Sequence, residues 1–242
     1  MTHLSVNLNK VALLRNQRTI GIPSVSKAAR ICMDAGAYGI TVHPRPDERH
    51  IRFSDVYELS DLVSSVEFNI EGNPFEGSYL EIVRKVKPTQ CTLVPDSPDA
   101  VTSDHGWTLQ KDGARLRPLI AEMKDLGSRV SLFMDYDSDE ISGAKEIGAD
   151  RIELHTEPYA TAFREGDPEP IWKEYGEAAR AAQGSGLGVN AGHDLNLENV
   201  GKFCSIPGVL EVSIGHALTG EALEMGLANT VKAYLGILSQ TD

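Results

Sequence analysis

Short apolar segments alternate with longer amphipathic ones along the whole chain, and this alternation limits the possible fold more than any other feature. The apolar segments have the length and the β-branched content of buried strands. We expect strands at residues 4–9, 39–44, 67–72, 90–95, 129–135, 151–157, 186–193 and 210–216. Hydrophobic residues recur with helical spacing between them, for example over residues 24–36, 77–87, 114–127 and 169–183.

This order of elements predicts an α/β fold made of parallel β/α units, and eight such units close a TIM (β/α)8 barrel. Gly36, Gly127 and Gly148 follow helical segments and are expected to end them in the left-handed conformation. An open doubly wound sheet is the alternative, but no glycine-rich phosphate fingerprint follows the first strand. We expect one catalytic barrel domain over residues 1–242. The longer segments 96–113 and 158–170 are candidates for lids or small extra helices.

The composition excludes some classes of function. A net charge of −12 argues against non-specific binding of nucleic acid or of an anionic membrane, which needs a basic face. The sequence has neither a signal-peptide pattern nor an apolar run long enough to span a membrane. The three cysteines Cys32, Cys91 and Cys204 lack metal-ligand spacing, and we interpret them as buried free thiols in a reducing cytosol.

Polar side chains gather at the carboxyl ends of the expected strands, where barrel enzymes build their active sites. Four of the seven histidines lie in or just after an expected strand, namely His43, His155, His193 and His216. Histidine exchanges protons near neutral pH, so several imidazoles at one barrel mouth favour acid–base catalysis.

Three carboxylates on the expected strands have different interpretations. Glu71 lies on an otherwise apolar strand, and burial beside histidines would give it the pKa of a useful base. Glu153 shares a strand face with His155 and serves either catalysis or a salt bridge. We interpret Asp135 as structural.

Two groups of residues predict anion binding. Arg45, Arg49 and His50 follow His43 in one loop, and arginine suits bidentate recognition of phosphate or carboxylate. Lys10 and Arg18 add positive charge after the first strand. The stretch SIGHALTGEAL (213–223) places a glycine before a helix start, where barrels frequently bind phosphate. Two anion sites beside a His/Glu centre indicate chemistry that joins two phosphorylated small molecules.

The same strand ends carry a family resemblance. The stretches VNLNKVALLRNQR, GITVHPRPDERHI, FNIEGN, TLVPDSPDAVTS, RIELHTEPYA, VNAGHDLN and SIGHALTG resemble the pyridoxine 5′-phosphate synthase family of de novo vitamin B6 biosynthesis. The resemblance implies a cytoplasmic homo-octamer of barrels without a cofactor or a metal. It implies condensation of 1-deoxy-D-xylulose 5-phosphate with 3-amino-2-oxopropyl phosphate, giving pyridoxine 5′-phosphate, phosphate and water.

The resemblance also implies roles for single residues. The acid–base residues are His43, Glu71 and His193. The residues implied for the deoxyxylulose phosphate are Asn9, Lys10, Arg45, His50 and Thr102. Those implied for the aminoketone phosphate are Asn7, Arg18, Asp194, Gly215 and His216.

This chain departs from the family pattern at two places. Many members have Asp-His where this chain has Asn9-Lys10, so any proton transfer by that histidine is lost or reassigned. Asp194 stands where glycine is often found, and its charge is unfavourable next to a phosphate. Both departures concern ligand contacts more than the reaction.

Three alternatives remain open from the residues alone. A metal-dependent barrel aldolase or isomerase would use His43, Glu71, Glu153, His155 and His193 as ligands. A Schiff-base aldolase would use Lys10. A non-catalytic sensor of phosphorylated metabolites would keep Arg45 and Gly215 but would not need Glu71 or His193 in proton-transfer positions.

Overall fold

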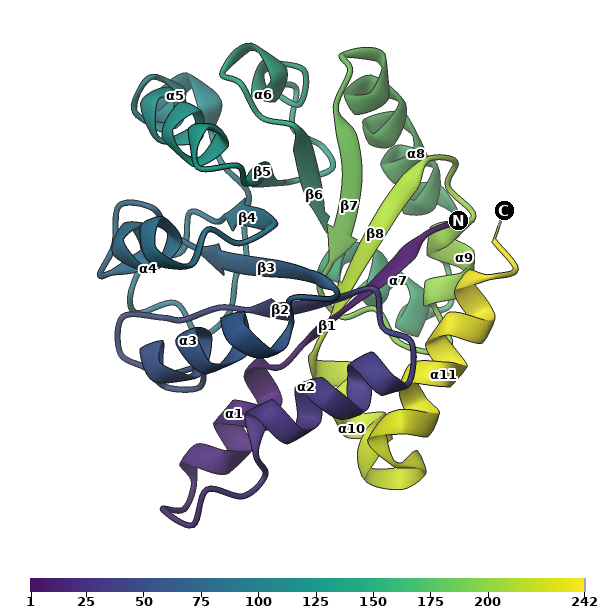
Figure 1. Cartoon of the computed structure of the whole chain (residues 1–242). Helices are drawn as coiled ribbons and strands as arrows, with labels where there is room; N and C mark the ends of the chain where they lie inside the picture. Colours follow the sequence, from purple (N-terminus) through teal and green to yellow (C-terminus); the bar gives the residue numbers. More distant parts are fainter. Residues whose placement is uncertain (242) are drawn as a thin grey trace.

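The computed structural model describes residues 1–241, and their strands form one closed parallel barrel in sequential order, β1 to β8 (Figure 1). The strands are β1 His3–Asn7, β2 Gly39–Val42, β3 Glu67–Gly72, β4 Gln90–Leu93, β5 Arg129–Met134, β6 Arg151–His155, β7 Gly188–Gly192 and β8 Val209–Ile214. Ser5 pairs with Gly39 on β2 and with Ser213 on β8, which closes the barrel. The predicted TIM barrel is confirmed.

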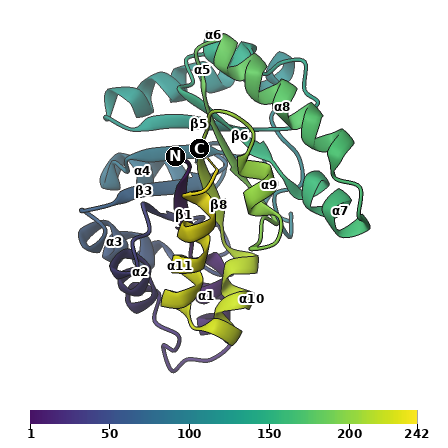
Figure 2. The same ribbon diagram turned by 90° about the vertical axis from the view of Figure 1, so that its right-hand side faces the viewer.

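Helices cover the outside of the barrel (Figures 1 and 2). They are α1 Asn9–Asn16, α2 Val25–Asp34, α3 Phe53–Leu62, α4 Tyr79–Val86, α5 Leu109–Asp125, α6 Gly143–Glu146, α7 Glu157–Glu165, α8 Glu169–Gly184, α9 Val200–Cys204, α10 His216–Met225 and α11 Leu227–Leu238. Helix α11 packs against α2 and β1, so the last described helix closes the barrel wall beside the first strand. None of the helices within residues 1–241 is long and apolar enough to cross a membrane.

Every second residue of a strand points outward into the apolar layer under the helices. Leu4 and Val6 of β1 are buried there, as are Ile40 and Val42 of β2. This two-residue period is what a strand packed between two layers requires. The helices end where glycines allow a left-handed backbone, with φ of +104° at Gly36, +92° at Gly127 and +104° at Gly148.

The inward-facing residues are mostly polar, unlike the branched apolar side chains that usually fill such barrels. In the middle layer Ser5 Oγ and Thr41 Oγ1 share a hydrogen bond of 2.7 Å, and Thr92 Oγ1 donates to Asn69 Oδ1 at 3.0 Å. These hydrogen bonds satisfy polar groups that would otherwise be costly to bury.

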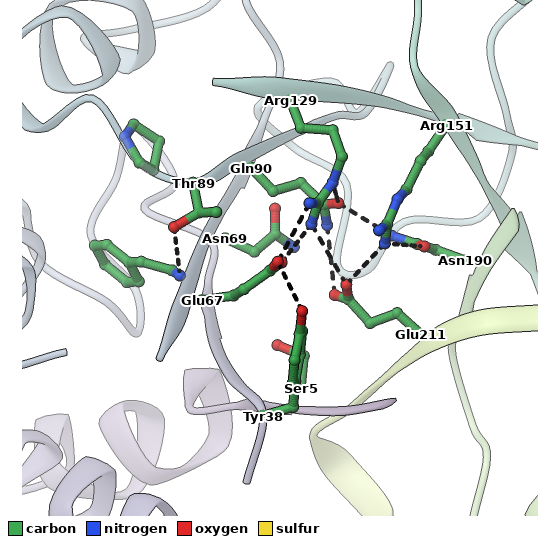
Figure 3. A network of polar contacts seen from close by, with 12 residues as sticks. Ser5, Tyr38, Glu67, Asn69, Thr89, Gln90, Arg129, Arg151, Asn190 and Glu211 are labelled. Carbon is green, nitrogen blue, oxygen red and sulfur yellow. Dashed lines mark hydrogen bonds and ion pairs between the residues drawn. The ribbon is translucent and has the colours of Figure 1, made fainter. Parts of the chain in front are cut away.

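An ion-pair network closes the amino-terminal end of the barrel (Figure 3). Arg129 pairs with Glu67 and reaches Glu211 at 3.8 Å, while Arg151 Nη1 donates to Glu211 Oε2 at 3.1 Å. Gln90 Nε2 donates to Glu211 Oε1 at 3.4 Å across the barrel. Each buried charge therefore has a partner of opposite sign, which offsets its desolvation. This network lies at the opposite end of the barrel from the strand ends that carry the candidate site.

The element boundaries differ from the sequence predictions at the carboxyl ends of strands. The expected strand 4–9 ends at Asn7, because the Asn7 side chain accepts the backbone N–H of Asn9 at 3.0 Å and turns the chain into α1. The expected loop 96–113 ends earlier, since α5 begins at Leu109. The Glu140 carboxylate accepts the N–H groups of Leu109 and Gln110 at 2.5 and 2.9 Å, a cap supplied from another loop. Segment 158–170 does contain a small extra helix, α7.

The three cysteines are free and buried, as predicted. Burial raises the pKa of each thiol to about 12. All three therefore stay protonated near neutral pH and have a packing role.

Candidate active site

A cavity of about 530 Å³ opens at the carboxyl ends of the strands. Every residue implied for the site lines this cavity except Arg18. These lining residues are Asn7, Asn9, Lys10, His43, Arg45, His50, Glu71, Thr102, His193, Asp194, Gly215 and His216. They come from the ends of β1, β2, β3, β7 and β8 and from the loop after β4. The parallel strands bring together residues as distant in the sequence as Asn7 and His216, which is how barrels assemble sites.

Glu71 lies at the centre of the cavity wall, inside the barrel. Its carboxylate accepts hydrogen bonds from Asn7 Nδ2 at 3.3 Å and from Ser213 Oγ at 3.4 Å. Burial raises the pKa of Glu71 to about 7, and the nearby charge of Asp96 adds to the rise. A carboxyl with this pKa accepts and releases protons near neutral pH, as a general base must.

His43 stands directly beside this base. Its Nδ1 lies 3.9 Å from Glu71 Oε2, within electrostatic reach but beyond a hydrogen bond. Burial lowers the pKa of His43 well below its usual value, and the neighbouring Arg45 lowers it further. The ring is therefore neutral near pH 7 and has a nitrogen free to accept a proton.

Glu153 extends the same buried carboxyl cluster from β6. Only 4% of its surface is exposed. Burial raises its pKa well above the usual value, with the charge of Glu71 as the second cause. Two buried carboxyls that repel each other share a proton, so Glu153 stays protonated while Glu71 titrates. The salt-bridge interpretation of Glu153 has no support, because no cation within residues 1–241 pairs with it.

His193 lies across the cavity, at the end of β7. Its Nε2 shares a hydrogen bond of 2.9 Å with Thr102 Oγ1. Its ring packs edge-on against the ring of His155, with 5.2 Å between the centroids. Burial lowers the pKa of His193, and His155 lowers it further. The ring is therefore mostly neutral near pH 7, and it acts as a general acid only after it has taken up a proton during the reaction.

Asp135 orients the imidazole ring of His155. Its carboxylate oxygen lies 3.6 Å from His155 Nδ1, and its other oxygen accepts the Gly106 N–H at 2.9 Å. His155 lines the cavity, whereas Asp135 supports it, in line with the structural interpretation of Asp135.

Of the residues expected to bind an anion, Lys10, Arg45 and His50 line the cavity, whereas Arg49 does not line it and pairs with Asp47 at 2.7 Å. Arg45 is 4% exposed and Lys10 faces the cavity beside it. His50 Nδ1 accepts the N–H of Ile51 at 2.9 Å, and burial followed by Arg45 lowers the His50 pKa to about 4. His50 is therefore neutral with its proton on Nε2, so it donates one hydrogen bond toward a ligand.

The second candidate anion site is the start of α10. Gly215 immediately precedes this helix, whose first backbone N–H groups lack partners within the helix. A Cβ atom at Gly215 would come within 3.0 Å of the Asn7 side chain, so glycine keeps β1 and β8 close together. Asp194 lines the cavity and has a positive φ of 57°, as His193 has at 97°.

The Asn9-Lys10 departure is compatible with this geometry. The Asn9 amide oxygen accepts the backbone N–H of His43 at 2.9 Å, a bond that an aspartate oxygen could make equally well. The side-chain nitrogen of Asn9 is then a donor rather than a second acceptor. Lys10 adds a basic side chain to the cavity wall.

Arg18 lies outside the cavity. It is an exposed residue of the segment between α1 and α2. The structure therefore does not bring it together with the other predicted residues, and its contact with the aminoketone phosphate stays a prediction.

Sequence reasoning missed Asp96, Ser103 and Ser213, which contact the site residues. Ser213 could have been found, because it lies on β8 two residues before Gly215 and therefore faces inward. Asp96 and Ser103 lie in an irregular loop, whose path no periodicity reveals.

The side chains that the structure describes around the cavity do not form a set of metal ligands. Across residues 1–241, no three His, Cys, Asp or Glu side chains are grouped so that they could hold a metal ion. The expected ligands instead bond to protein groups, as Glu71 does to Asn7 and Ser213.

The fold and the cavity define a β/α-barrel enzyme with a buried carboxyl–imidazole centre beside a group of cations. The family model described as "Pyridoxal phosphate biosynthesis protein PdxJ" matches residues 4–240. The chain belongs to this family.

Curated relatives agree with this assignment. The chain is 57% identical to a protein named pyridoxine 5′-phosphate synthase from Xanthomonas campestris pv. campestris strain B100, over 98% of this chain and 96% of that protein. It is 55% identical to the protein of the same name from Albidiferax ferrireducens, over 99% of this chain and 98% of that protein.

Solved structures with low identity share the fold alone. One described as KGPDC from Streptococcus mutans has a TM-score of 0.65 at 12% identity and covers all of this chain and 99% of that one. A structure described as native KDPGal has a TM-score of 0.62 at 14% identity, over 98% of this chain and 95% of that one.

Proposed function

We propose that the chain is a pyridoxine 5′-phosphate synthase that condenses 1-deoxy-D-xylulose 5-phosphate with 3-amino-2-oxopropyl phosphate. The products are pyridoxine 5′-phosphate, inorganic phosphate and water. Membership of the family and the names of the relatives support the reaction. The observation that carries it is Glu71, a buried carboxyl with a pKa of about 7 between His43 and the protonated Glu153.

The reaction begins when the amine of the aminoketone attacks the ketone of the pentulose and gives an imine after loss of water. Removal of a proton from carbon gives an enamine, and phosphate leaves the former pentulose. A second carbonyl addition closes the ring, and loss of water with proton shifts makes it aromatic. Each step moves a proton, so the reaction needs a base and an acid in one cavity.

The role of each catalytic residue follows from its pKa. Glu71 removes protons, because it is half ionised near pH 7. His43 accepts protons as a neutral imidazole. His193, on the opposite wall, is mostly neutral at rest because its pKa is lowered. It takes up a proton in an earlier step of the reaction and then donates this proton readily to a leaving oxygen atom.

Two anion sites hold the substrates on either side of this centre. We assign the deoxyxylulose phosphate to Arg45, His50, Thr102 and the Asn9-Lys10 pair. We assign the aminoketone phosphate to the start of α10 at Gly215 and His216, together with Asn7, Asp194 and Arg18. Loop 96–105 would cover the bound intermediates and exclude water.

The family resemblance also supports a wider biological setting. We propose that the chain acts as a single catalytic domain, in the cytoplasm, as a homo-octamer. Sedimentation velocity of the purified chain tests the assembly, and a dimer or monomer at working concentration would contradict it.

The test of the function is turnover of the two purified phosphates with EDTA present. Pyridoxine 5′-phosphate and released phosphate should appear in equal amounts with the parent chain, and Glu71→Gln should form little of either. Activity that EDTA removes and a divalent metal restores would favour the metal-dependent aldolase. Trapping of substrate on Lys10 by borohydride would favour the Schiff-base aldolase, and binding of both phosphates without turnover would favour a sensor.

A further inference from the structure

Asp96 is a buried carboxylate that the proposed mechanism does not use. It lies three residues beyond the end of β4, and 3% of its side chain is exposed. One of its oxygen atoms, Oδ1, has no hydrogen-bond partner within residues 1–241. A buried, half-satisfied carboxylate costs free energy, so a contribution to stability does not explain its presence.

The contacts of Asp96 join three loops around the cavity. Its Oδ2 pairs with Arg45 Nη2 from the loop after β2 and accepts Ser103 Oγ at 2.7 Å. Its backbone oxygen accepts Asn73 Nδ2 at 2.9 Å from the loop after β3. Asp96 therefore fixes the loop after β4 at its start, through Asn73, and at its far end, through Ser103.

The loop held in this way carries Thr102 to the opposite wall. Thr102 precedes Ser103 and shares its hydrogen bond of 2.9 Å with His193 Nε2. The path Arg45–Asp96–Ser103–Thr102–His193 thus connects the anion-binding cation to the candidate acid. Each link except the peptide bond between Thr102 and Ser103 is a hydrogen bond or an ion pair.

Arg45 depends on this carboxylate for its direction. Its Nη1 donates to the Ala100 carbonyl at 3.0 Å, and its Nη2 pairs with Asp96. A guanidinium has five N–H donors, so three remain for a ligand in the cavity. Because the planar group is held at two points, these remaining donors have a fixed orientation.

We propose that Asp96 is a positioning residue, which orients Arg45 toward the substrate phosphate and places Thr102 on His193. This inference rests on the proposed function. Asp96 does not line the cavity, whereas Arg45 and Thr102 do, so it acts through these two neighbours.

Asp96 also lies near the candidate base, because it lines a small cavity together with His43 and with Gly72, the residue after Glu71. The titratable or charged groups around Glu71 are His43, Arg45, Asp96 and Glu153. Of these, Asp96 contributes the repulsion that adds to burial in raising the pKa of Glu71. Loss of its negative charge therefore lowers the pKa of Glu71 and extends activity to lower pH.

The test is a double-mutant cycle on purified full-length protein with the variants Asp96→Asn, Arg45→Met and the double variant. Asp96→Asn should lower kcat/KM about tenfold in the parent chain. The same change should cost less than about twofold in the Arg45→Met background, because the cation that Asp96 orients is absent and the asparagine oxygen can still accept the Ser103 hydroxyl. Equal losses in both backgrounds would overturn the proposal.

The pH profile separates positioning from a general loss of structure. For Asp96→Asn the acid side of the kcat/KM profile should move to lower pH, whereas Ser103→Ala, which loosens the same loop without removing a charge, should leave it in place. The matched control is Asp99→Asn, an exposed aspartate of the same loop, which should leave both kcat/KM and the profile unchanged. An unmoved profile for Asp96→Asn would contradict the electrostatic part of the proposal.

Ser103→Ala tests the link to His193 without removing a charge. It should lower kcat about fivefold, as expected for one lost hydrogen bond that orders the loop, and leave the acid side of the profile in place. Unchanged kcat would overturn this link. The variant also keeps the proposal testable if Asp96→Asn fails to fold.

Failure of the proposed function would be seen separately, as absence of product with the parent chain. In that case the same cycle is run on the binding of inorganic phosphate, measured by calorimetry. Non-additive effects of Asp96→Asn and Arg45→Met on phosphate affinity would support the positioning role, and additive effects would overturn it.

Discussion

Replacement of Glu71 by glutamine is predicted to stabilise the protein while it abolishes activity. Burial and Asp96 raise the pKa of Glu71 from the usual 4.5 to about 7. Since one pKa unit corresponds to about 1.4 kcal/mol, holding the ionised carboxylate in this site costs about 3 kcal/mol. Glutamine has nearly the same shape and remains neutral at every pH.

The sign of the effect follows from proton linkage. The folded state binds the proton of Glu71 more tightly than the unfolded chain does. The stability that the folded protein gains from this protonated Glu71 is therefore fully present below pH 4.5 and is lost as the pH rises through about 7. Glu71→Gln should gain little over the parent at pH 4.5 and about 3 kcal/mol in unfolding free energy at pH 8.

Denaturant unfolding of both proteins at several pH values measures this difference. At pH 8 the gain corresponds to a rise in melting temperature of about 6–12 °C for a domain of this size. Glu165→Gln, at an exposed position of α7, controls for the removal of one negative charge from a chain of net charge −12. A gain of the same size at pH 4.5 and pH 8, or a loss of stability at pH 8, would refute the reasoning.

Three further substitutions test other parts of the structure. Lys10→Met should raise KM for the deoxyxylulose phosphate about tenfold in steady-state assays, because a charged contact is lost; an unchanged KM would exclude Lys10 from the site. Asp194→Gly should lower KM for the aminoketone phosphate about threefold, because it removes a carboxylate from the anion site. A raised KM would show that the Asp194 side chain binds the substrate. The unfolding free energy of this variant should stay within about 1 kcal/mol, because relief of the positive φ is offset by the freedom of glycine. Arg129→Met should lower the unfolding free energy by about 3 kcal/mol, because it leaves Glu67 and Glu211 without this partner. The KM values should not change, since the network lies at the far end of the barrel. A loss below about 1 kcal/mol would contradict the role of the network.

The sequence predicted the fold because its local signals agree with one another. Apolar strands, helical periodicity and glycines such as Gly36 all indicate parallel β/α units. The errors lie where tertiary contacts override local preference. The Glu140 carboxylate starts α5 four residues before the expected loop 96–113 ends, by capping an N-terminus that is distant in sequence.

The candidate site was predictable to the extent that strand ends define it. His43, Glu71 and His193 were found because parallel strands must bring their carboxyl ends together. Asp96 could not be found, since its role depends on where an irregular loop folds back onto Arg45. The polar interior was missed for a different reason. Attention to strand ends left out the inward positions further down, such as Asn69 and Gln90, although the two-residue period places them there.

The pH dependence of kcat/KM for pyridoxine 5′-phosphate formation tests the central claim most directly, because it reports ionisation of the free enzyme's base. We expect an acid-side midpoint at about 7, set by the buried Glu71, when the two phosphates are the substrates and EDTA is present. A midpoint near the 4.5 of an ordinary carboxyl, or no product at any pH, would contradict the claim.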